Sequence, residues 1–191
     1  MKNVDNKKII GLDMDGVIID HTLAKIKLAK NFGFNLKPHE THPDIIKKII
    51  AEPFLKKIKY TLYDDPDFYK SSLLMDGAKD GLKYIKKQNL PFVLISRRID
   101  SSGAIKVLKF HGLWPQFFNK DNAFFVAEPE DKNVKAKEIG VTHYVDDQAH
   151  VIEKLIDVKN RFLFDNLGAF QDIVGYTRVK SWKELIRHFI N

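Results

Sequence analysis

The chain contains no cysteine among its 191 residues, which excludes disulfide bonds and thiolate metal sites. It also has no apolar run close to the roughly 20 residues that a membrane-spanning helix needs. The N-terminus lacks the apolar stretch of a secretory signal. We therefore expect a cytoplasmic protein that does not associate with membranes.

Arginine is scarce, occurring only at positions 97, 98, 161, 178 and 187, so lysine carries most of the net charge of +7. Sequence-specific nucleic-acid binding relies on bidentate arginine contacts, and here the lysines are spread along predicted helices and form no basic block. This pattern argues against nucleic acid as the partner. A positive field also attracts small phosphorylated molecules, which we expect instead. The oligomeric state cannot be inferred from these features.

Helices and strands alternate regularly from Gly77 onward. After the apolar run that ends at Leu12, the pattern predicts strands over 91–95, 124–127, 143–145 and 161–164, separated by helices. Strands joined by helices of this length form parallel sheets with right-handed crossovers. We therefore predict an α/β fold with a doubly wound, Rossmann-like parallel sheet.

The segment between the first strand and Gly77 has a different character. Its three amphipathic stretches, over 21–31, 45–51 and 54–62, predict helices and no strand of the main sheet. With 44% hydrophobic residues, the chain can form one core and a small accessory unit. We therefore expect a core built from residues 1–20 and 75–191 and an all-helical cap formed by residues 21–74.

Polar residues stand where three of the predicted strands end. Asp13 and Asp15 follow the first strand, Ser96 follows the second, and Asp146 and Asp147 follow a later one. In open α/β sheets, ligands bind outside the carboxyl ends of the strands. Converging carboxylates repel one another unless a cation lies between them, so the pattern predicts a site for a hard divalent ion such as Mg²⁺.

Four segments carry a family resemblance: Asp13–Val17, Leu94–Ser96, Glu130–Asn133 and Tyr144–Asp147. In this order they are similar to the four motifs of the haloacid dehalogenase (HAD) superfamily of aspartate-nucleophile phosphatases. The helical insertion resembles the small cap of the 5′(3′)-deoxyribonucleotidase-like group. The resemblance implies a HAD-type core domain and Mg²⁺-dependent hydrolysis of phosphomonoesters.

The resemblance also implies roles for individual residues. Asp13 would be the nucleophile that forms an aspartyl phosphate, and it would also bind the metal. Asp15 would act as general acid and then general base, with its main-chain carbonyl facing the metal. Ser96 would bind a phosphoryl oxygen, and Lys132 would offset charge in the transition state.

Some of these assignments remain open at the level of sequence. Asp147 aligns with the usual metal ligand and Asp146 would orient Lys132 or a metal-bound water, although the two aspartates could exchange roles. Lys135 and Lys137, on the helix predicted over 133–138, compete with Lys132 for the catalytic role, although the spacing to Asp146 favours Lys132. Arg97 and Arg98 follow the second motif and would bind a distal anion of the substrate or form surface salt bridges.

The expected substrate is a nucleoside monophosphate. Sugar phosphates and a nucleic-acid 3′-phosphate are alternatives within the same chemistry, because the cap shows no recognisable nucleotide-reading motif. An alternative of another class is a metal- and phosphate-binding protein of HAD fold that has lost turnover. The presence of both Asp13 and Asp15 argues against that alternative, because a binding protein has no need for the pair.

Overall fold

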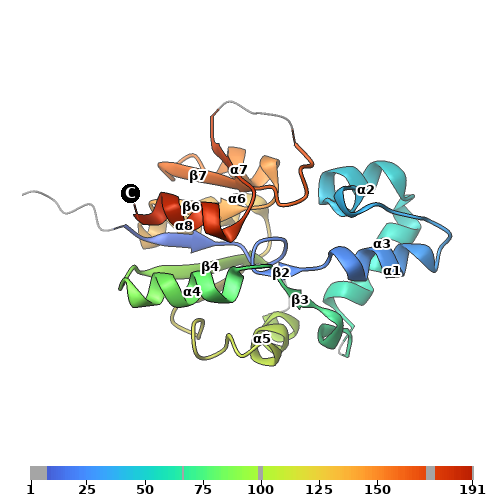
Figure 1. Cartoon of the computed structure of the whole chain (residues 1–191), viewed down its shortest axis with the longest axis horizontal. Helices are drawn as coiled ribbons and strands as arrows, with labels where there is room; N and C mark the ends of the chain where they lie inside the picture. The colour runs from blue at the N-terminus through green and yellow to red at the C-terminus, as the bar shows by residue number, and fades with distance from the viewer. Residues whose placement is uncertain (1–7, 66, 99–100, 171–174, 191) are drawn as a thin grey trace, which may run out of the picture.

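A six-stranded parallel sheet lies at the centre of the protein (Figure 1). The computed structural model describes residues 8–65, 67–98, 101–170 and 175–190. The strand order is β5-β4-β1-β6-β7-β8, so the chain builds outward from β1 first on one side and then on the other. The strands are β1 (Ile10–Leu12), β4 (Phe92–Arg97), β5 (Ala123–Val126), β6 (His143–Asp146), β7 (Asn160–Phe164) and β8 (Thr177–Val179).

The register of the sheet places the chemistry-bearing residues at one edge. Leu12 is paired with Leu94 on one side and with Val145 on the other, so these three residues share one level of the sheet. The residues that follow them therefore emerge together at the carboxyl ends of β1, β4 and β6. This edge is also where the strand order reverses, the usual position of a binding crevice in such sheets.

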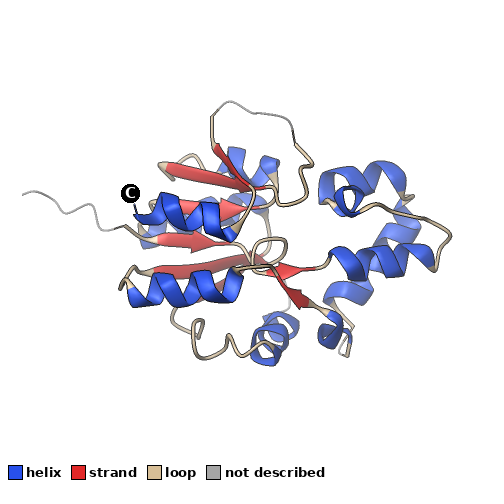
Figure 2. Ribbon diagram, in the orientation of Figure 1, coloured by secondary structure: helices blue, strands red, loops and turns tan. Residues whose placement is uncertain are grey.

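Helices cover both faces of the sheet and confirm the predicted α/β class (Figure 2). Alternate strand residues point to opposite faces, so Leu94 and Val145 belong to one apolar cluster while Val93 and Tyr144 belong to the other. The first cluster is completed by α4 (Ala78–Lys87), α5 (Ser101–Phe110) and α8 (Trp182–Ile190), and the second by α6 (Pro129–Ile139) and α7 (Ala149–Lys154). None of the helices in the described part of the chain has the length and apolar character to cross a lipid bilayer.

The cap lies beyond the carboxyl ends of the strands (Figure 1). Its helices are α1 (Thr22–Lys30), α2 (Pro43–Ile49) and α3 (Glu52–Tyr63), with two short 3₁₀ helices, η1 (Pro38–Thr41) and η2 (Phe68–Ser71). Buried cap residues, among them Ile46, Leu55 and Ile58, form an apolar cluster separate from the two clusters of the sheet. The helical cap after the first strand is thus confirmed, and it has its own small core.

Two short strands join the cap to the core and correct the expectation that the insertion is entirely helical. β2 (Ile19–Asp20) pairs antiparallel with β3 (Leu73–Leu74), and β3 lies within the segment expected to be helical. Two residues are too few to produce a visible alternation, which is why the sequence pattern missed both strands. On the basis of this strand pair and the separate cap cluster, we propose a core of residues 1–20 and 75–191 and a cap of residues 21–74. Residues 1–7 of the core lie outside the described part of the chain.

Two other elements differ from the sequence expectation. The helix expected over 133–138 begins earlier, at Pro129, because Glu128 and Asp131 form a capping box around the first turn. This extension brings Lys132 into the helix. The edge strand β8 was not predicted, since only Val179 of its three residues is buried.

Candidate active site

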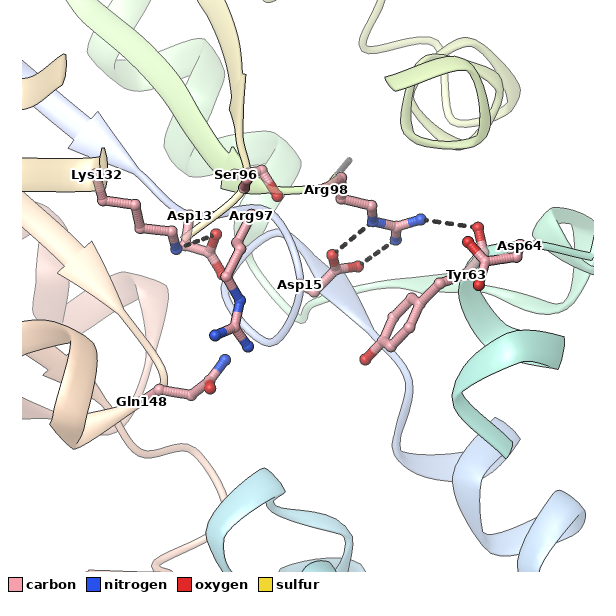
Figure 3. Close-up of a pocket in the computed structure, with 10 residues that line it drawn as sticks. Asp13, Asp15, Tyr63, Asp64, Ser96, Arg97, Arg98, Lys132 and Gln148 are labelled. Atoms are coloured by element: carbon pink, nitrogen blue, oxygen red, sulfur yellow. Dashed lines mark hydrogen bonds and ion pairs between the residues drawn. The ribbon is translucent and has the colours of Figure 1, made fainter. Parts of the chain in front are cut away.

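The three strand ends and helix α6 surround a cavity of about 290 Å³. Asp13 follows β1, Ser96 is near the end of β4, and Lys132 reaches the same space from α6 (Figure 3). Asp15, Tyr63 and further residues of both core and cap complete the lining. The structure therefore brings together residues that are separated by more than a hundred positions in the chain.

Lys132 is held between two carboxylates at the base of this cavity. Its Nζ lies 2.7 Å from Oδ1 of Asp13 and 2.7 Å from Oδ2 of Asp146, and all three side chains are buried. Burial raises the pKa of Asp13 to about 7, although Lys132 opposes this effect. Burial favours the neutral form of Lys132, but Asp13 and Asp146 outweigh it and raise the lysine's pKa well above the ordinary value.

The two other candidate lysines, Lys135 and Lys137, form ion pairs outside the cavity. Nζ of Lys135 lies 2.5 Å from a carboxylate oxygen of Glu138, and Nζ of Lys137 lies 3.0 Å from one of Asp157. Both pairs are on the exposed side of α6, away from the cavity. Of the three candidates, the structure places only Lys132 beside the carboxylates of Asp13 and Asp146.

Three buried aspartates form a possible metal site. Asp13, Asp146 and Asp147 each offer a carboxylate oxygen, and these oxygens lie within 4.8 Å of one another. Burial raises the pKa of Asp147 well above its usual value, and the neighbouring Asp146 and Asp13 add to the effect. Oδ1 of Asp147 is buried without a hydrogen-bond partner in the described part of the chain. A cluster of hard oxygen ligands with an unsatisfied buried atom fits Mg²⁺.

The two aspartates of the last motif have different surroundings. Asp146 accepts hydrogen bonds from Lys132 and from the backbone N–H of Gln148. Asp147 lies directly against Gly16, where a Cβ atom would overlap its carboxylate. Asp146 therefore orients the lysine, while Asp147 retains an oxygen for a ligand. This arrangement favours the assignment of Asp147 as metal ligand that the family resemblance implies.

Ser96 is the second residue of the site with an unsatisfied atom. Its side chain is buried, and Oγ has no hydrogen-bond partner among the described residues. Unpaired buried hydroxyl groups are rare because losing water without a replacement partner costs free energy. Because Ser96 lines the same cavity as Asp13, a bound oxygen atom in that cavity would restore the missing hydrogen bond.

The side chains of Arg98 and His21 both contact the carboxylate of Asp15. Nε of Arg98 donates to Oδ2 at 3.0 Å, Nη2 of Arg98 donates to Oδ1 at 2.7 Å, and Nε2 of His21 lies 2.7 Å from Oδ1. Burial alone would raise the pKa of Asp15, but Arg98 and His21 hold it well below its usual range. Asp15 is therefore ionised in this arrangement.

The two consecutive arginines occupy different environments. Arg98 is buried, donates to the backbone carbonyl of Tyr63 at 3.4 Å, and stacks over the Tyr63 ring at 4.7 Å. It thus connects Asp15 to the end of cap helix α3. Arg97 is exposed and extends toward Gln148 at the opening of the cavity (Figure 3). Arg97 can therefore contact a substrate directly, whereas Arg98 would first have to break its contacts with Asp15 and Tyr63.

Some residues of the site were not identified from the sequence. The histidines form no ligand motif in the sequence, yet His21 contacts Asp15, and Nε2 of His42 lies 2.8 Å from the backbone oxygen of Asp147. Nδ1 of His42 accepts the N–H of Asp44, so Nε2 carries the proton and the ring is neutral. The second contact joins residues 105 positions apart, and no spacing rule connects a cap residue with a strand end.

Comparison with protein families gave a match over almost the whole chain. Residues 7–190 match the family described as 5′ nucleotidase, deoxy (pyrimidine), cytosolic type C protein. The matched range contains both the core and the inserted helices. A comparison with curated proteins found no match.

Solved structures share the fold at low sequence identity. A HAD family hydrolase from Deinococcus radiodurans, crystallised with phosphate and sodium, has a TM-score of 0.64 at 14% identity, with 95% of this chain and 94% of that chain covered. A haloacid dehalogenase-like protein from Agrobacterium tumefaciens reaches 0.67 at 17% identity, covering 96% and 97%. A HAD-superfamily hydrolase of subfamily IA from Geobacter sulfurreducens reaches 0.62 at 14% identity, covering 98% of both chains.

Proposed function

This chain belongs to the 5′ nucleotidase, deoxy (pyrimidine), cytosolic type C protein family within the HAD phosphatases, and we propose that it is a Mg²⁺-dependent, cytoplasmic hydrolase of nucleoside monophosphates. The proposed nucleophile is Asp13, the proposed general acid and base is Asp15, and Ser96 and Lys132 bind the phosphoryl group. The proposed metal ligands are the carboxylates of Asp13 and Asp147, the main-chain carbonyl of Asp15, and Asp146 directly or through water.

One observation carries the proposal: a lysine-bound carboxylate and an unpaired serine hydroxyl line the same cavity. Asp13 is fixed by Lys132 at 2.7 Å, and Ser96 Oγ lacks a partner in the described chain. A phosphoryl group between them would receive hydrogen bonds from Ser96 and Lys132 while Asp13 faced the phosphorus atom. Because these hydrogen-bond donors are already in position before the substrate binds, no free energy is spent on reorienting them during the reaction.

The reaction divides into two displacements. In the first, an oxygen of Asp13 forms a bond to phosphorus, the bond to the leaving oxygen breaks, and Asp15 supplies a proton to that oxygen. In the second, water attacks phosphorus, Asp15 takes its proton, and the bond to Asp13 breaks to release phosphate. A Mg²⁺ ion bound by the aspartates would offset negative charge on the phosphoryl oxygens.

Asp15 must change its contacts during this cycle. The ionised carboxylate that the structure shows is suited to accept a proton from water, whereas the first displacement requires the protonated form. A dianionic phosphate ester placed near Asp15 favours its protonation by charge repulsion and competes for Arg98. Substrate binding would therefore loosen the Arg98–Asp15 contact and prepare the acid for its first role.

The experiment that tests this proposal measures phosphate release from 5′- and 3′-nucleotides, sugar phosphates and a 3′-phosphorylated oligonucleotide. Each substrate is assayed with Mg²⁺ and with chelator, for the wild type and for Asp13→Asn. We expect release that needs Mg²⁺, falls to background in Asp13→Asn, and is fastest with nucleotides. Turnover that survives in a folded Asp13→Asn protein would falsify the mechanism. Faster release from sugar phosphates or the oligonucleotide would reject only the nucleotide assignment.

A further inference from the structure

A second cavity of about 370 Å³ lies between cap and core, beside the catalytic cavity. The two share Tyr63, Arg97 and Gln148 as lining residues. A substrate whose phosphate lies beside Asp13 would therefore extend its leaving group past these three residues into the second cavity. We call this second space the distal cavity.

The floor of the distal cavity is apolar and belongs to the cap's own core. Ile46, Leu55, Ile58 and Leu62 line it, and all four are buried members of the cap cluster. Because these side chains also hold the cap helices together, the floor is a fixed surface. It suits the carbon skeleton of a leaving group and offers no hydrogen bonds.

Cations surround this floor and outnumber the carboxylates. Lys25, Lys47 and Lys59 come from the cap, and Arg97 comes from the core. Asp44 is the sole carboxylate that lines the cavity among the described residues, and Nζ of Lys47 already lies 2.7 Å from its Oδ1. The remaining cations, Lys25, Lys59 and Arg97, form no ion pair with any residue between positions 8 and 190 that the structure describes.

Lys25 stands between the distal cavity and the catalytic carboxylates. Its half-buried side chain lines both the distal cavity and a small cleft beside Asp15 and Asp147, and its Nζ donates to the backbone carbonyl of Thr41 at 3.1 Å. Burial lowers the pKa of Lys25; Asp147 and Asp15 oppose this, while the nearby Lys59 adds to it. An anion between the two ammonium groups would relieve their repulsion.

We propose that the distal cavity is an anion subsite, and that the preferred substrates are phosphomonoesters whose leaving group carries a second phosphate or a carboxylate. This inference rests on the proposed function, since it concerns the far end of the same substrate. A neutral leaving group would fill the apolar floor but would place no negative charge among Lys25, Lys59 and Arg97. Hydrogen bonds between charged partners are about twice as strong as neutral ones, so the second anion adds affinity that a base or sugar alone does not.

Matched substrate pairs test the inference. The first pair is a nucleoside 5′-monophosphate and the 3′,5′-bisphosphate of the same nucleoside, and the second is a phosphorylated hydroxy acid and the corresponding phosphorylated alcohol. For each pair we measure the ratio of kcat/KM, with the doubly anionic member in the numerator. We expect a ratio of roughly ten or more in one or both pairs, because a hydrogen bond to a charged group contributes about that factor. The pair with the higher ratio identifies phosphate or carboxylate as the anion.

Variants assign the preference to named residues. Lys25→Met and Lys59→Gln should each lower the ratio several-fold, and the double variant should lower it further, with Arg97 as the one remaining unpaired cation among the described lining residues. The control is Lys57→Gln, because Lys57 is two residues from Lys59 on α3, faces the other side of the helix and contacts Phe32. Lys59 is exposed, so Lys59→Gln tests the inference even where Lys25→Met fails to fold.

The outcomes separate this inference from the proposed function. Two results would overturn the anion subsite: kcat/KM ratios near one in the wild type, or a high ratio that the double variant leaves unchanged. Hydrolysis that depends on Asp13 would then still support the proposed function. Absence of hydrolysis with all four substrates would count against the proposed function. In that case, dissociation constants of the four compounds measured by calorimetry with Asp13→Asn still decide the inference, because equal affinities within each pair reject it.

Discussion

Arg98 holds Asp15 through both carboxylate oxygens, with Nε 3.0 Å from Oδ2 and Nη2 2.7 Å from Oδ1. The guanidinium group also contacts the carbonyl and ring of Tyr63 in the cap. One side chain thus joins the proposed general acid to the element that covers the active site. Bidentate pairs of this kind fix orientation as well as charge.

A double-mutant cycle on Arg98 and Asp15 should show strong coupling. Arg98→Met alone leaves a largely buried carboxylate without its main partner and should reduce the free energy of unfolding by about 3 kcal/mol or more. In the Asp15→Asn background the same change should have a much smaller effect. Urea denaturation of the four proteins measures the coupling. Equal effects of Arg98→Met in both backgrounds would show that the pair contributes no specific interaction energy.

Lys132→Met should destabilise the fold because Asp13 and Asp146 would then face each other without a cation. Breaking a buried ion pair by removing one partner costs about 3–5 kcal/mol. Lys135→Met, on the same helix, removes only an exposed pair with Glu138 and should cost less than about 1 kcal/mol. Thermal unfolding of the two variants compares these costs. Similar losses in both would contradict the central position that we assign to Lys132.

The close contact between Gly16 and Asp147 predicts a specific defect in metal binding. Gly16 and Gly33 both have φ of 85°, so an alanine at either position carries the same type of backbone strain. A Cβ at Gly16 would overlap the Asp147 carboxylate, whereas at Gly33 it meets no atom within 4 Å. Mg²⁺ that binds the folded state raises its melting temperature, and at a given Mg²⁺ concentration the rise grows with the logarithm of the affinity. We expect this rise in the wild type and in Gly33→Ala, but a much smaller one in Gly16→Ala.

Magnesium titrations followed by thermal unfolding make that comparison directly. Because both alanine variants lose stability from strain, each variant's Mg²⁺-induced rise is compared with its own melting temperature without metal. A full rise in Gly16→Ala would mean that Asp147 is not needed in its present position for metal binding.

His143 should contribute to acid sensitivity of the fold at a distance from the active site. Burial lowers its pKa to about 4, and Lys8 and Lys159 add to this effect. Between pH 6.5 and about 4 the unfolded chain therefore takes up a proton at this histidine while the folded protein does not, so stability falls as pH falls through this range. His143→Gln should flatten the decline, whereas His39→Gln, which changes an exposed cap histidine, should not. Urea unfolding at a series of pH values measures both slopes, and parallel slopes in all three proteins would exclude a contribution of His143.

The sequence predicted those parts of the structure whose signals are local or repeated. The alternation of apolar strands and amphipathic helices predicted the parallel sheet, and residues such as Asp13, Ser96 and Asp146 were located because strand ends share one edge. Lys132 was preferred over Lys135 and Lys137 by its spacing from Asp146, and the structure explains this preference, since the helix beginning at Pro129 points only Lys132 inward.

Contacts between cap and core could not be predicted in the same way. Neither the Arg98–Tyr63 contact nor the His42–Asp147 contact follows from periodicity, because each depends on how the two units meet. The same holds for the convergence of Lys25 and Arg97 on the distal cavity. Local periodicity specifies helices and strands, but it does not specify the relative position of two separate apolar cores. Such contacts require coordinates.

The pairing of Ile19 with Leu74 places the two ends of the cap segment on neighbouring strands. A short turn could therefore close the core without the inserted helices, since antiparallel neighbours need only two connecting residues. The proposed catalytic carboxylates lie at the strand ends of the core, whereas the apolar floor and the unpaired Lys25 and Lys59 belong to the inserted segment. Under the proposed function, catalysis and substrate selection therefore depend on separate stretches of the chain, and the inserted segment can change in evolution while the catalytic residues are kept.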